Sequence, residues 1–176
     1  LGNGMTFPLW YGESCVLFTD RTTTDKTFEV IEKFKPTLYF SVPTLFVALL
    51  QALESTGSGT SVSPDFSSLR MSVSAGEALP DYILRRWKEH TGTHILDGIG
   101  STEALHIFIS NRADDIKAGS SGRTVPGYSA KIMNENNKEV SQGEAGRLLI
   151  KGDSVCKYYW KNEEKTSATI VNGWLN

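Results

Sequence analysis

The chain has 176 residues, of which 39% are hydrophobic and 22% are charged, and its formal net charge is −2. This composition is that of an ordinary globular protein, and it lacks the basic excess that a nucleic-acid-binding surface needs. No apolar run approaches the roughly 20 residues that span a bilayer, and residues 1–5 lack the basic segment of a signal peptide. We therefore expect neither a nucleic-acid nor a membrane partner, while the oligomeric state stays unknown.

The two cysteines, Cys15 and Cys156, lie far apart and do not have the spacing of metal ligands. We expect both thiols to be reduced and to serve packing, which fits a cytoplasmic protein. The chain begins at Leu1 and ends at Asn176, in the middle of a residue pattern. We therefore expect it to be a piece of a longer protein.

Helical spacing and strand-like apolar runs alternate from residue 3 to residue 110. Pro43 and Pro80 stand where a helix can begin, because proline is tolerated in the first turn, and Gly92 stands where a helix would stop. The expected helices span residues 3–11 and 25–35, the latter capped by Thr24, and two more follow Pro43 and Pro80. The expected strands span residues 14–18, 38–42, 69–74, 94–96 and 107–110, and residues 55–64 form a small polar loop.

The pattern changes near residue 117, where helical periodicity ends and glycines separate short strand-like runs. We expect strands at residues 129–133 and 147–151, a polar connection at 134–137 and a last short helix within 161–170. The expected fold class is therefore α/β: a mostly parallel sheet with helices on both faces, followed by the start of an antiparallel or barrel subdomain.

Residues 97–103, with the sequence DGIGSTE, combine two glycines, two hydroxyls and a carboxylate. Glycines let the backbone approach a ligand closely, and hydroxyls and amides at the start of a helix suit a phosphate. A carboxylate beside phosphate oxygens is a natural ligand of Mg²⁺. The stretch is typical of a nucleotide or acyl-phosphate turn between a strand and a short helix, but an ordinary glycine-rich loop with a capping hydroxyl has the same pattern.

A second glycine-containing turn, at residues 75–77, follows the preceding expected strand. Ligands of open α/β sheets bind outside the carboxyl ends of the strands. Because both turns follow consecutive strands at these ends, we expect them to line one crevice. This arrangement favours a ligand site without identifying the ligand.

Four stretches, in order, carry a resemblance to a known family. They are SAGEALP (74–80), DGIGSTE (97–103), GSSGRTVPG (119–127) and GEAGRL (143–148), the last followed by Gly152 and by Tyr159 and Trp160. These stretches resemble successive motifs of the adenylate-forming enzymes, which include acyl- and aryl-CoA ligases, luciferase-type enzymes and peptide-synthetase adenylation domains. Residues 97–111, with His106 after Leu105, look more particularly like benzoate–CoA ligases.

The resemblance covers essentially the whole chain and implies an AMP-binding domain. Residues 1–115 would be its α/β subdomain and residues 116–176 its β-rich portion. The family's phosphate loop would precede this stretch, and the ribose-binding aspartate and a mobile C-terminal domain with a catalytic lysine would follow it. We therefore expect the piece alone to be inactive as a ligase.

The resemblance also implies an ATP site. Asp97 would accept a hydrogen bond from the adenine amino group, and Ile99 stands where many members carry an aromatic residue that stacks on the base. The positions that would contact adenine and ribose are Gly76, Glu77, Ala78, Asp97, Gly98 and Ile99. By composition alone, a residue such as Glu77 is more often a solvated loop carboxylate than a ligand contact.

Thr102 and Glu103 are the catalytic positions that the resemblance implies. Thr102 would hydrogen-bond the α-phosphate and Glu103 would hold Mg²⁺, while no side chain would act as a nucleophile. The aromatic acid would be bound by Ala75, Gly100, His106 and Ile107, two of which are small enough to leave room for a flat ring. A histidine in an apolar run is otherwise most often a packing residue.

The implied activity is that of an ATP-dependent carboxylate–CoA ligase acting on an aromatic acid such as benzoate. The carboxylate would attack the α-phosphate of ATP, and coenzyme A would then displace AMP from the acyl-adenylate. A peptide-synthetase-type adenylation domain, a fatty acyl-CoA ligase and a nucleotide-binding module without catalysis are the alternatives that the sequence leaves open.

Overall fold

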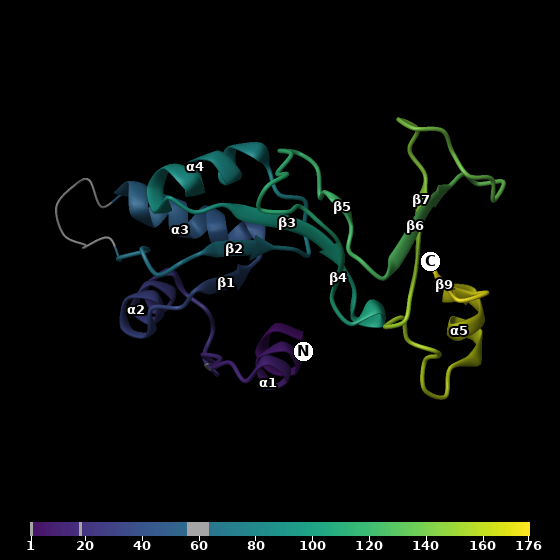
Figure 1. The fold of residues 1–176 in the computed structure, drawn as a ribbon, viewed down its shortest axis with the longest axis horizontal. Coiled ribbons are helices and arrows are strands. Elements are labelled where there is room, and N and C mark those ends of the chain that lie inside the picture. Colours follow the sequence, from purple (N-terminus) through teal and green to yellow (C-terminus); the bar gives the residue numbers. More distant parts are fainter. Residues whose placement is uncertain (1, 18, 56–63) are drawn as a thin grey trace. The chain divides into compact units, whose positions relative to one another are not determined.

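A computed structural model describes residues 2–17, 19–55 and 64–176, and Figure 1 shows its helices and strands. Helices and strands alternate along the first half of the chain, as the sequence predicts. The elements of this half are η1 (Gly2–Thr6), α1 (Phe7–Tyr11), α2 (Thr24–Phe34), β1 (Leu38–Ser41), α3 (Pro43–Ser55), β2 (Met71–Ser74), α4 (Asp81–Thr91), β3 (Ile95–Gly100), η3 (Thr102–Ala104) and β4 (Ile107–Ser110).

Short strands dominate the second half of the chain, again as expected. Its elements are β5 (Arg123–Thr124), β6 (Tyr128–Met133), β7 (Arg147–Gly152), α5 (Glu163–Thr169), β8 (Ile170–Val171) and β9 (Trp174–Leu175). The predicted strand over residues 14–18 is wrong at 14–17, which are exposed and have no regular structure, while residue 18 and most of the predicted loop 55–64 lie outside the described residues. The run has strand composition, but strand preference depends on pairing and burial that these residues do not obtain.

The strands form two sheets, one in the order β1-β2-β3-β4-β5 and one in the order β6-β7-β9-β8. In the first sheet β1, β2 and β3 are parallel, and in the second β6 pairs with β7, β7 with β9, and β8 with β9 in antiparallel fashion. The predicted α/β class, with a mainly parallel sheet followed by an antiparallel one, is confirmed. Among the described helices, none is long and apolar enough to cross a membrane.

The chain divides into two compact units, one of residues 1–99 and 110–122 and one of residues 100–109 and 123–176. The division falls within β3 and β4. Each unit has a hydrophobic core of its own. The assignment of residues 1–115 and 116–176 to two subdomains of an AMP-binding domain stays a prediction.

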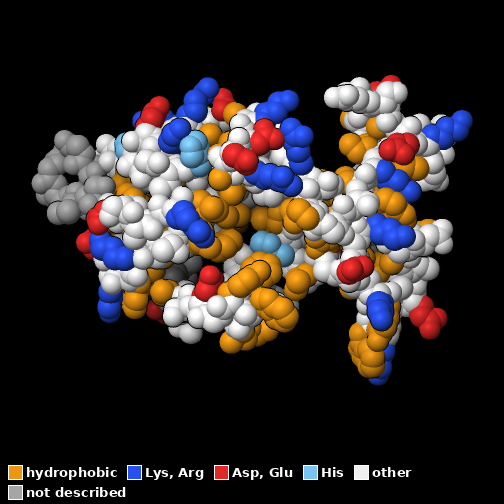
Figure 2. Space-filling view, viewed as in Figure 1, with side chains coloured by type: hydrophobic (Ala, Val, Ile, Leu, Met, Phe, Trp, Pro, Cys, Tyr) orange, Lys and Arg blue, Asp and Glu red, His pale blue; other side chains and the backbone are white. Residues whose placement is uncertain are grey.

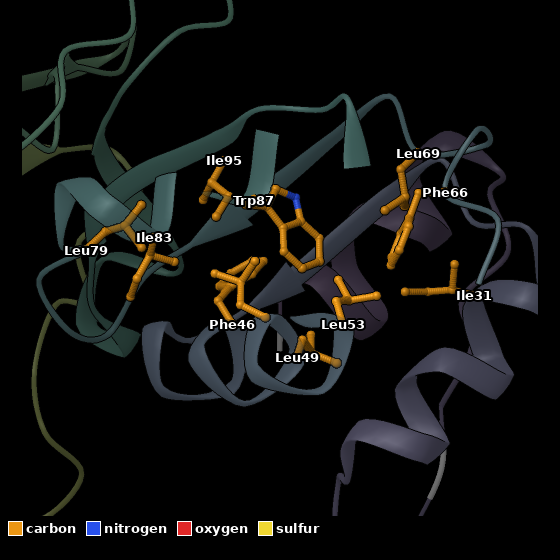
Figure 3. Close-up of a cluster of buried hydrophobic side chains, with 11 residues drawn as sticks. Ile31, Phe46, Leu49, Leu53, Phe66, Leu69, Leu79, Ile83, Trp87 and Ile95 are labelled. Atoms are coloured by element: carbon orange, nitrogen blue, oxygen red, sulfur yellow. The ribbon is translucent and has the colours of Figure 1, made fainter. Parts of the chain in front are cut away.

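Trp87 of α4 is the centre of the first unit's core and is fully buried. Its ring meets Phe46 of α3 edge to face at 4.8 Å between centroids and lies stacked over Tyr39 of β1 at 6.2 Å. Figure 3 shows Trp87 between the strands and α3, with Ile83 and Ile95 nearby. Because α3 and α4 pack on the same side of β1–β3 (Figure 1), their apolar faces fix the positions of the strand ends that carry the candidate site.

The limits of α2 and α4 follow from local chemistry. The Thr23 hydroxyl accepts from the Lys26 amide at 3.2 Å, so the cap of α2 is one residue earlier than the sequence suggests. Gly92 ends α4 as predicted, with φ at 73° and its amide donating to the carbonyl of Lys88 at 2.9 Å. Because α2 and α4 have defined ends, the connections from them to the strands that follow, β1 and β3, are short.

On the face in Figure 2, the described Lys and Arg side chains are interspersed with Asp and Glu rather than gathered in a patch of one sign. Hydrophobic side chains gather over α1, where Leu9, Trp10 and Tyr11 are exposed.

Candidate functional site

The turn at residues 75–78 and the end of β3 lie at the same edge of the parallel sheet. Ser74 of β2 is directly opposite Asp97 of β3 in the strand register. Ala75 and Gly98 therefore leave neighbouring strands side by side, and Gly76 turns the chain with φ at 94°, a conformation that favours glycine. Within the first unit the strand register thus brings the start of the turn at 75–77 beside Gly98, while the expectation that the turns at 75–77 and 98–100 line one crevice stays a prediction. Gly76, Glu77 and Ala78 are exposed.

Asp97 is a buried carboxylate with only 6% of its surface exposed. Its Oδ2 accepts a hydrogen bond from the Ser121 hydroxyl at 2.9 Å, whereas its Oδ1 has no partner among the described residues. Burial raises the pKa of Asp97, and the Ser121 hydrogen bond opposes that shift. Since buried polar atoms are nearly always paired in folded proteins, Oδ1 is an acceptor available to a ligand donor such as an amino group.

Asn111 holds the segment that carries Ser121 against β3. Its backbone amide donates to the backbone carbonyl of Asp97 at 2.9 Å, and its side-chain Nδ2 donates to the backbone carbonyl of Ser120 at 2.6 Å. Its Oδ1 accepts from the amide of Lys117 at 3.0 Å. Neither Asn111 nor Ser121 is predicted from the sequence to have a role, because their contacts join residues that are 6 to 24 positions apart in the chain.

The stretch 97–103 differs from the predicted turn in one respect. Residues 97–100 are the end of β3, and the chain turns only at Ser101. The expected short helix is a 3₁₀ segment of three residues, Thr102–Ala104. A helix this short does not align enough peptide dipoles to attract an anion, and the side chain of Thr102 at its start is exposed.

Close backbone packing requires a glycine at position 100. A Cβ placed on Gly100 would lie 2.5 Å from the carbonyl oxygen of His106 and 2.8 Å from Cα of Ile107. The hydrogen bond from the Ser101 amide to the His106 carbonyl at 3.2 Å also shows how closely the two backbone segments approach. The expectation that Gly100 leaves room for a flat ring stays a prediction.

Ile107 begins β4, which returns beside Gly100, and His106 directly precedes it. Both side chains are partly buried. Burial lowers the pKa of His106, because desolvation disfavours the imidazolium. His106 is thus mainly neutral at pH 7, in keeping with a packing or pocket-lining side chain rather than with a cation.

Glu103 lies in the second unit on the wall of a cavity of ≈ 260 Å³. Its Oε1 accepts a hydrogen bond from the hydroxyl of Tyr159 at 2.8 Å, and this contact lowers the pKa of Glu103. Apolar side chains also line the cavity: Phe108, Leu148, Ile150 and Leu175. The carboxylate is thus kept ionised at an accessible surface.

These features fit a magnesium ligand. Mg²⁺ prefers oxygen ligands and is usually held by one or two carboxylates together with waters and substrate phosphates, not by an all-protein cage. Within the described ranges, no three His, Cys, Asp or Glu side chains are grouped as metal ligands. Glu103 therefore suits a cation that arrives with a nucleotide, and less so a permanently bound metal such as structural zinc.

Comparison with known proteins shows the family of the chain. The sequence pattern of the AMP-binding enzyme family matches residues 1–160. The chain is 44% identical to the benzoate–CoA ligase of Thauera aromatica over 175 residues, which are 99% of this chain and 32% of that protein.

Two solved structures share the fold closely. A benzoate–CoA ligase from Burkholderia xenovorans LB400 superposes with a TM-score of 0.90 at 43% identity, over 99% of this chain and 34% of that one. The anthranilate–CoA ligase AuaEII, in complex with anthranoyl-AMP, gives a TM-score of 0.91 at 42% identity, over 99% of this chain and 33% of that one. The chain thus spans about a third of the length of these relatives, and it belongs to the AMP-binding enzyme family.

Proposed function

We propose that the intact protein containing this chain is an ATP-dependent carboxylate–CoA ligase that activates an aromatic acid such as benzoate. The observation that carries the proposal is the 44% identity to a benzoate–CoA ligase along 99% of the chain. The anthranoyl-AMP bound to the similar anthranilate–CoA ligase supports an acyl-adenylate as the intermediate. The chain by itself, about a third of such a protein, is expected to lack ligase activity.

In this proposal Asp97 and the turn of residues 76–78 bind the adenine and ribose of ATP. The buried Oδ1 of Asp97 accepts a hydrogen bond from the adenine amino group, which gives an otherwise unpaired acceptor its partner. Gly98 brings the backbone close to the base, and the partly exposed Ile99 packs on it. These contacts fix the nucleotide and do not take part in bond making.

Thr102 and Glu103 act at the phosphates. The exposed Thr102 hydroxyl donates to an α-phosphate oxygen and orients it for attack. Glu103 would hold Mg²⁺, which when bound would neutralise the charge of the phosphates. The substrate carboxylate attacks the α-phosphorus, the bond to pyrophosphate breaks, and the thiol of coenzyme A then attacks the acyl carbon and releases AMP.

The aromatic acid is proposed to lie against Ala75, Gly100, His106 and Ile107. A neutral His106 suits this role, because an apolar ring is then not placed against a desolvated charge. A protein with these substrates would serve the degradation of aromatic acids in the cytoplasm. The absence of disulfides between the two cysteines, Cys15 and Cys156, is compatible with that location.

Carboxylate-dependent exchange between ATP and pyrophosphate tests the proposal. The intact protein, given ATP, Mg²⁺ and a panel of aromatic and fatty acids, should catalyse exchange with benzoate or a close derivative. Formation of the corresponding acyl-CoA should then require coenzyme A. A preference for fatty acids would favour a fatty acyl-CoA ligase, and no exchange with any carboxylate would overturn the proposal.

A further inference from the structure

The turn around Glu103 is anchored by residues that follow it by 24 to 56 positions. The amide of Cys156 donates to the carbonyl of Glu103 at 2.7 Å. The hydroxyls of Tyr128 and Ser154 each donate to the carbonyl of Ala104 at 2.9 Å. All these residues belong to the second unit, so the position of the turn is set by the β-rich part of the chain.

Tyr159 is the residue among these that reaches the carboxylate itself. Its hydroxyl lies 2.8 Å from Oε1 of Glu103, and both side chains line the same cavity of ≈ 260 Å³. The hydrogen bond engages one of the two carboxylate oxygens and fixes the rotation of the group. An ionised acceptor makes such a bond stronger than a neutral one.

Tyr159 is in turn held by two residues of α5. Its amide donates to the Thr166 hydroxyl at 2.9 Å. The ammonium of Lys165 lies over its ring, 4.1 Å from the centroid. Lys165 also contributes to the lowered pKa of Glu103. The ring of Tyr159, the ammonium of Lys165 and the carboxylate of Glu103 thus form one ordered group of side chains.

We propose that Tyr159 is a positioning residue for Glu103: its hydroxyl orients the carboxylate so that a cation can bind with the nucleotide. The inference rests on the proposed role of Glu103 as the Mg²⁺ ligand. Hydrogen-bond partners that orient metal ligands typically change metal affinity by about 10- to 100-fold when removed. They have a smaller effect on the rate once the metal is saturating.

The test compares Tyr159→Phe with wild type in the intact protein, with Tyr158→Phe as the control. Tyr158 is the neighbouring tyrosine and is 58% exposed. Pyrophosphate exchange is measured against free Mg²⁺ concentration. For Tyr159→Phe we expect the half-saturating Mg²⁺ concentration to rise about tenfold while the maximal rate stays within about threefold, and for Tyr158→Phe we expect neither to change. An unchanged Mg²⁺ requirement, or a lower maximal rate alone, would overturn the proposal.

A Glu103→Gln background separates positioning from a general structural effect. If Tyr159 acts through the Glu103 carboxylate, Tyr159→Phe adds no further change in Mg²⁺ requirement to Glu103→Gln. Additive changes would mean that Tyr159 acts elsewhere and would reject the inference.

A measurement that needs no turnover keeps the inference testable if the protein is inactive or if a variant does not fold. The protein is prepared with 3-fluorotyrosine in place of the tyrosine at position 159 or, as the control, at position 158. The ¹⁹F spectrum of each is recorded with ATP before and after Mg²⁺ is added. The signal from position 159 should shift and that from position 158 should not. If the signal at position 159 does not shift, the inference is contradicted, whether or not the protein activates carboxylates. If the signal shifts in a protein without exchange activity, only the proposed function is contradicted.

Discussion

The hydroxyl of Ser121 donates to Oδ2 of Asp97 at 2.9 Å, across 24 residues of chain. The bond gives a buried carboxylate one partner, but burial still raises the pKa of Asp97. An acid whose pKa is raised by folding binds more protons in the folded than in the unfolded state. The stability of the fold therefore falls as the pH rises from the ordinary value of 3.8 through the raised one.

Asp97→Asn should remove this pH-dependent cost, because the amide has similar shape and no charge. Relative to wild type, the variant should gain free energy of unfolding as the pH is raised from about 4 to 7, as measured by urea unfolding of the intact protein. Ser121→Ala is the matched change, and it should cost about 1–3 kcal/mol at pH 7 by removing a hydrogen bond to a charged group. A difference between Asp97→Asn and wild type that does not vary with pH would contradict the assigned cause.

Gly100→Ala should destabilise the protein by about 1–3 kcal/mol, since the added Cβ would overlap the His106 carbonyl at 2.5 Å. Thermal unfolding measures the loss. Gly4→Ala is the control, because a Cβ there meets only the end of the Leu17 side chain at 3.3 Å. If Gly100 were small only to admit a ring, Gly100→Ala would change the preferred acid and leave stability intact.

Local sequence patterns predicted the helices and strands that are specified by residues close together in the chain. Trp87 falls at helical spacing with Ile83, and Gly92 stops α4 where a C-terminal glycine belongs. The same reasoning located β4 and the neighbouring ends of β2 and β3, because apolar runs bounded by turn residues specify strands and parallel strands align their carboxyl ends. The resemblance to adenylate-forming enzymes supplied the residue roles, which local patterns do not contain.

The features that the sequence did not predict depend on contacts between distant segments. The apolar residues 14–17 have strand composition but remain exposed, whereas β8 and β9, of two residues each, exist only because they pair. The hydrogen bond from Tyr159 to Glu103 joins residues 56 positions apart. Tyr159 lies in a stretch that resembles a family motif, but nothing in its neighbours indicates which carboxylate it reaches.

Asp65→Asn should flatten the dependence of stability on acid pH. Hydrogen bonds from the Ser67 hydroxyl and amide, together with Lys35, lower the pKa of Asp65 to about 2. Because the folded pKa lies below the ordinary 3.8, the stabilisation is fully present above pH 3.8 and is lost as the pH falls toward 2. Urea unfolding between pH 5 and pH 2 should show a smaller decline for Asp65→Asn than for wild type.

Ser67→Ala is the matched change, because it removes the hydroxyl that contributes to the lowered pKa of Asp65. This variant should also show a smaller acid decline than wild type. Parallel declines of Asp65→Asn and wild type would mean that the contacts with Lys35 and Ser67 are not maintained in solution.

Leu105 occupies a strained turn directly after the 3₁₀ segment that contains Glu103. Its φ is 70° and its ψ is −48°, and the amide of His106 donates to the carbonyl of Ala104 at 2.9 Å across it. This is a γ-turn with a positive central φ, which is rare for a residue with a side chain. Backbone strain of this kind costs on the order of 1–3 kcal/mol and is found mainly where function fixes the geometry.

Comparing Leu105→Gly with Leu105→Ala isolates that strain, because both changes remove the leucine side chain. At ordinary positions alanine is more stable than glycine by about 0.4–1 kcal/mol through the unfolded state. At residue 105 we expect the reverse, with Leu105→Gly more stable than Leu105→Ala by about 1 kcal/mol in urea unfolding. The control is Ala52→Gly in α3, which should lose about 1 kcal/mol. Equal or greater stability of Leu105→Ala would show that the turn relaxes in solution, and that Glu103 is then held by its hydrogen bonds alone.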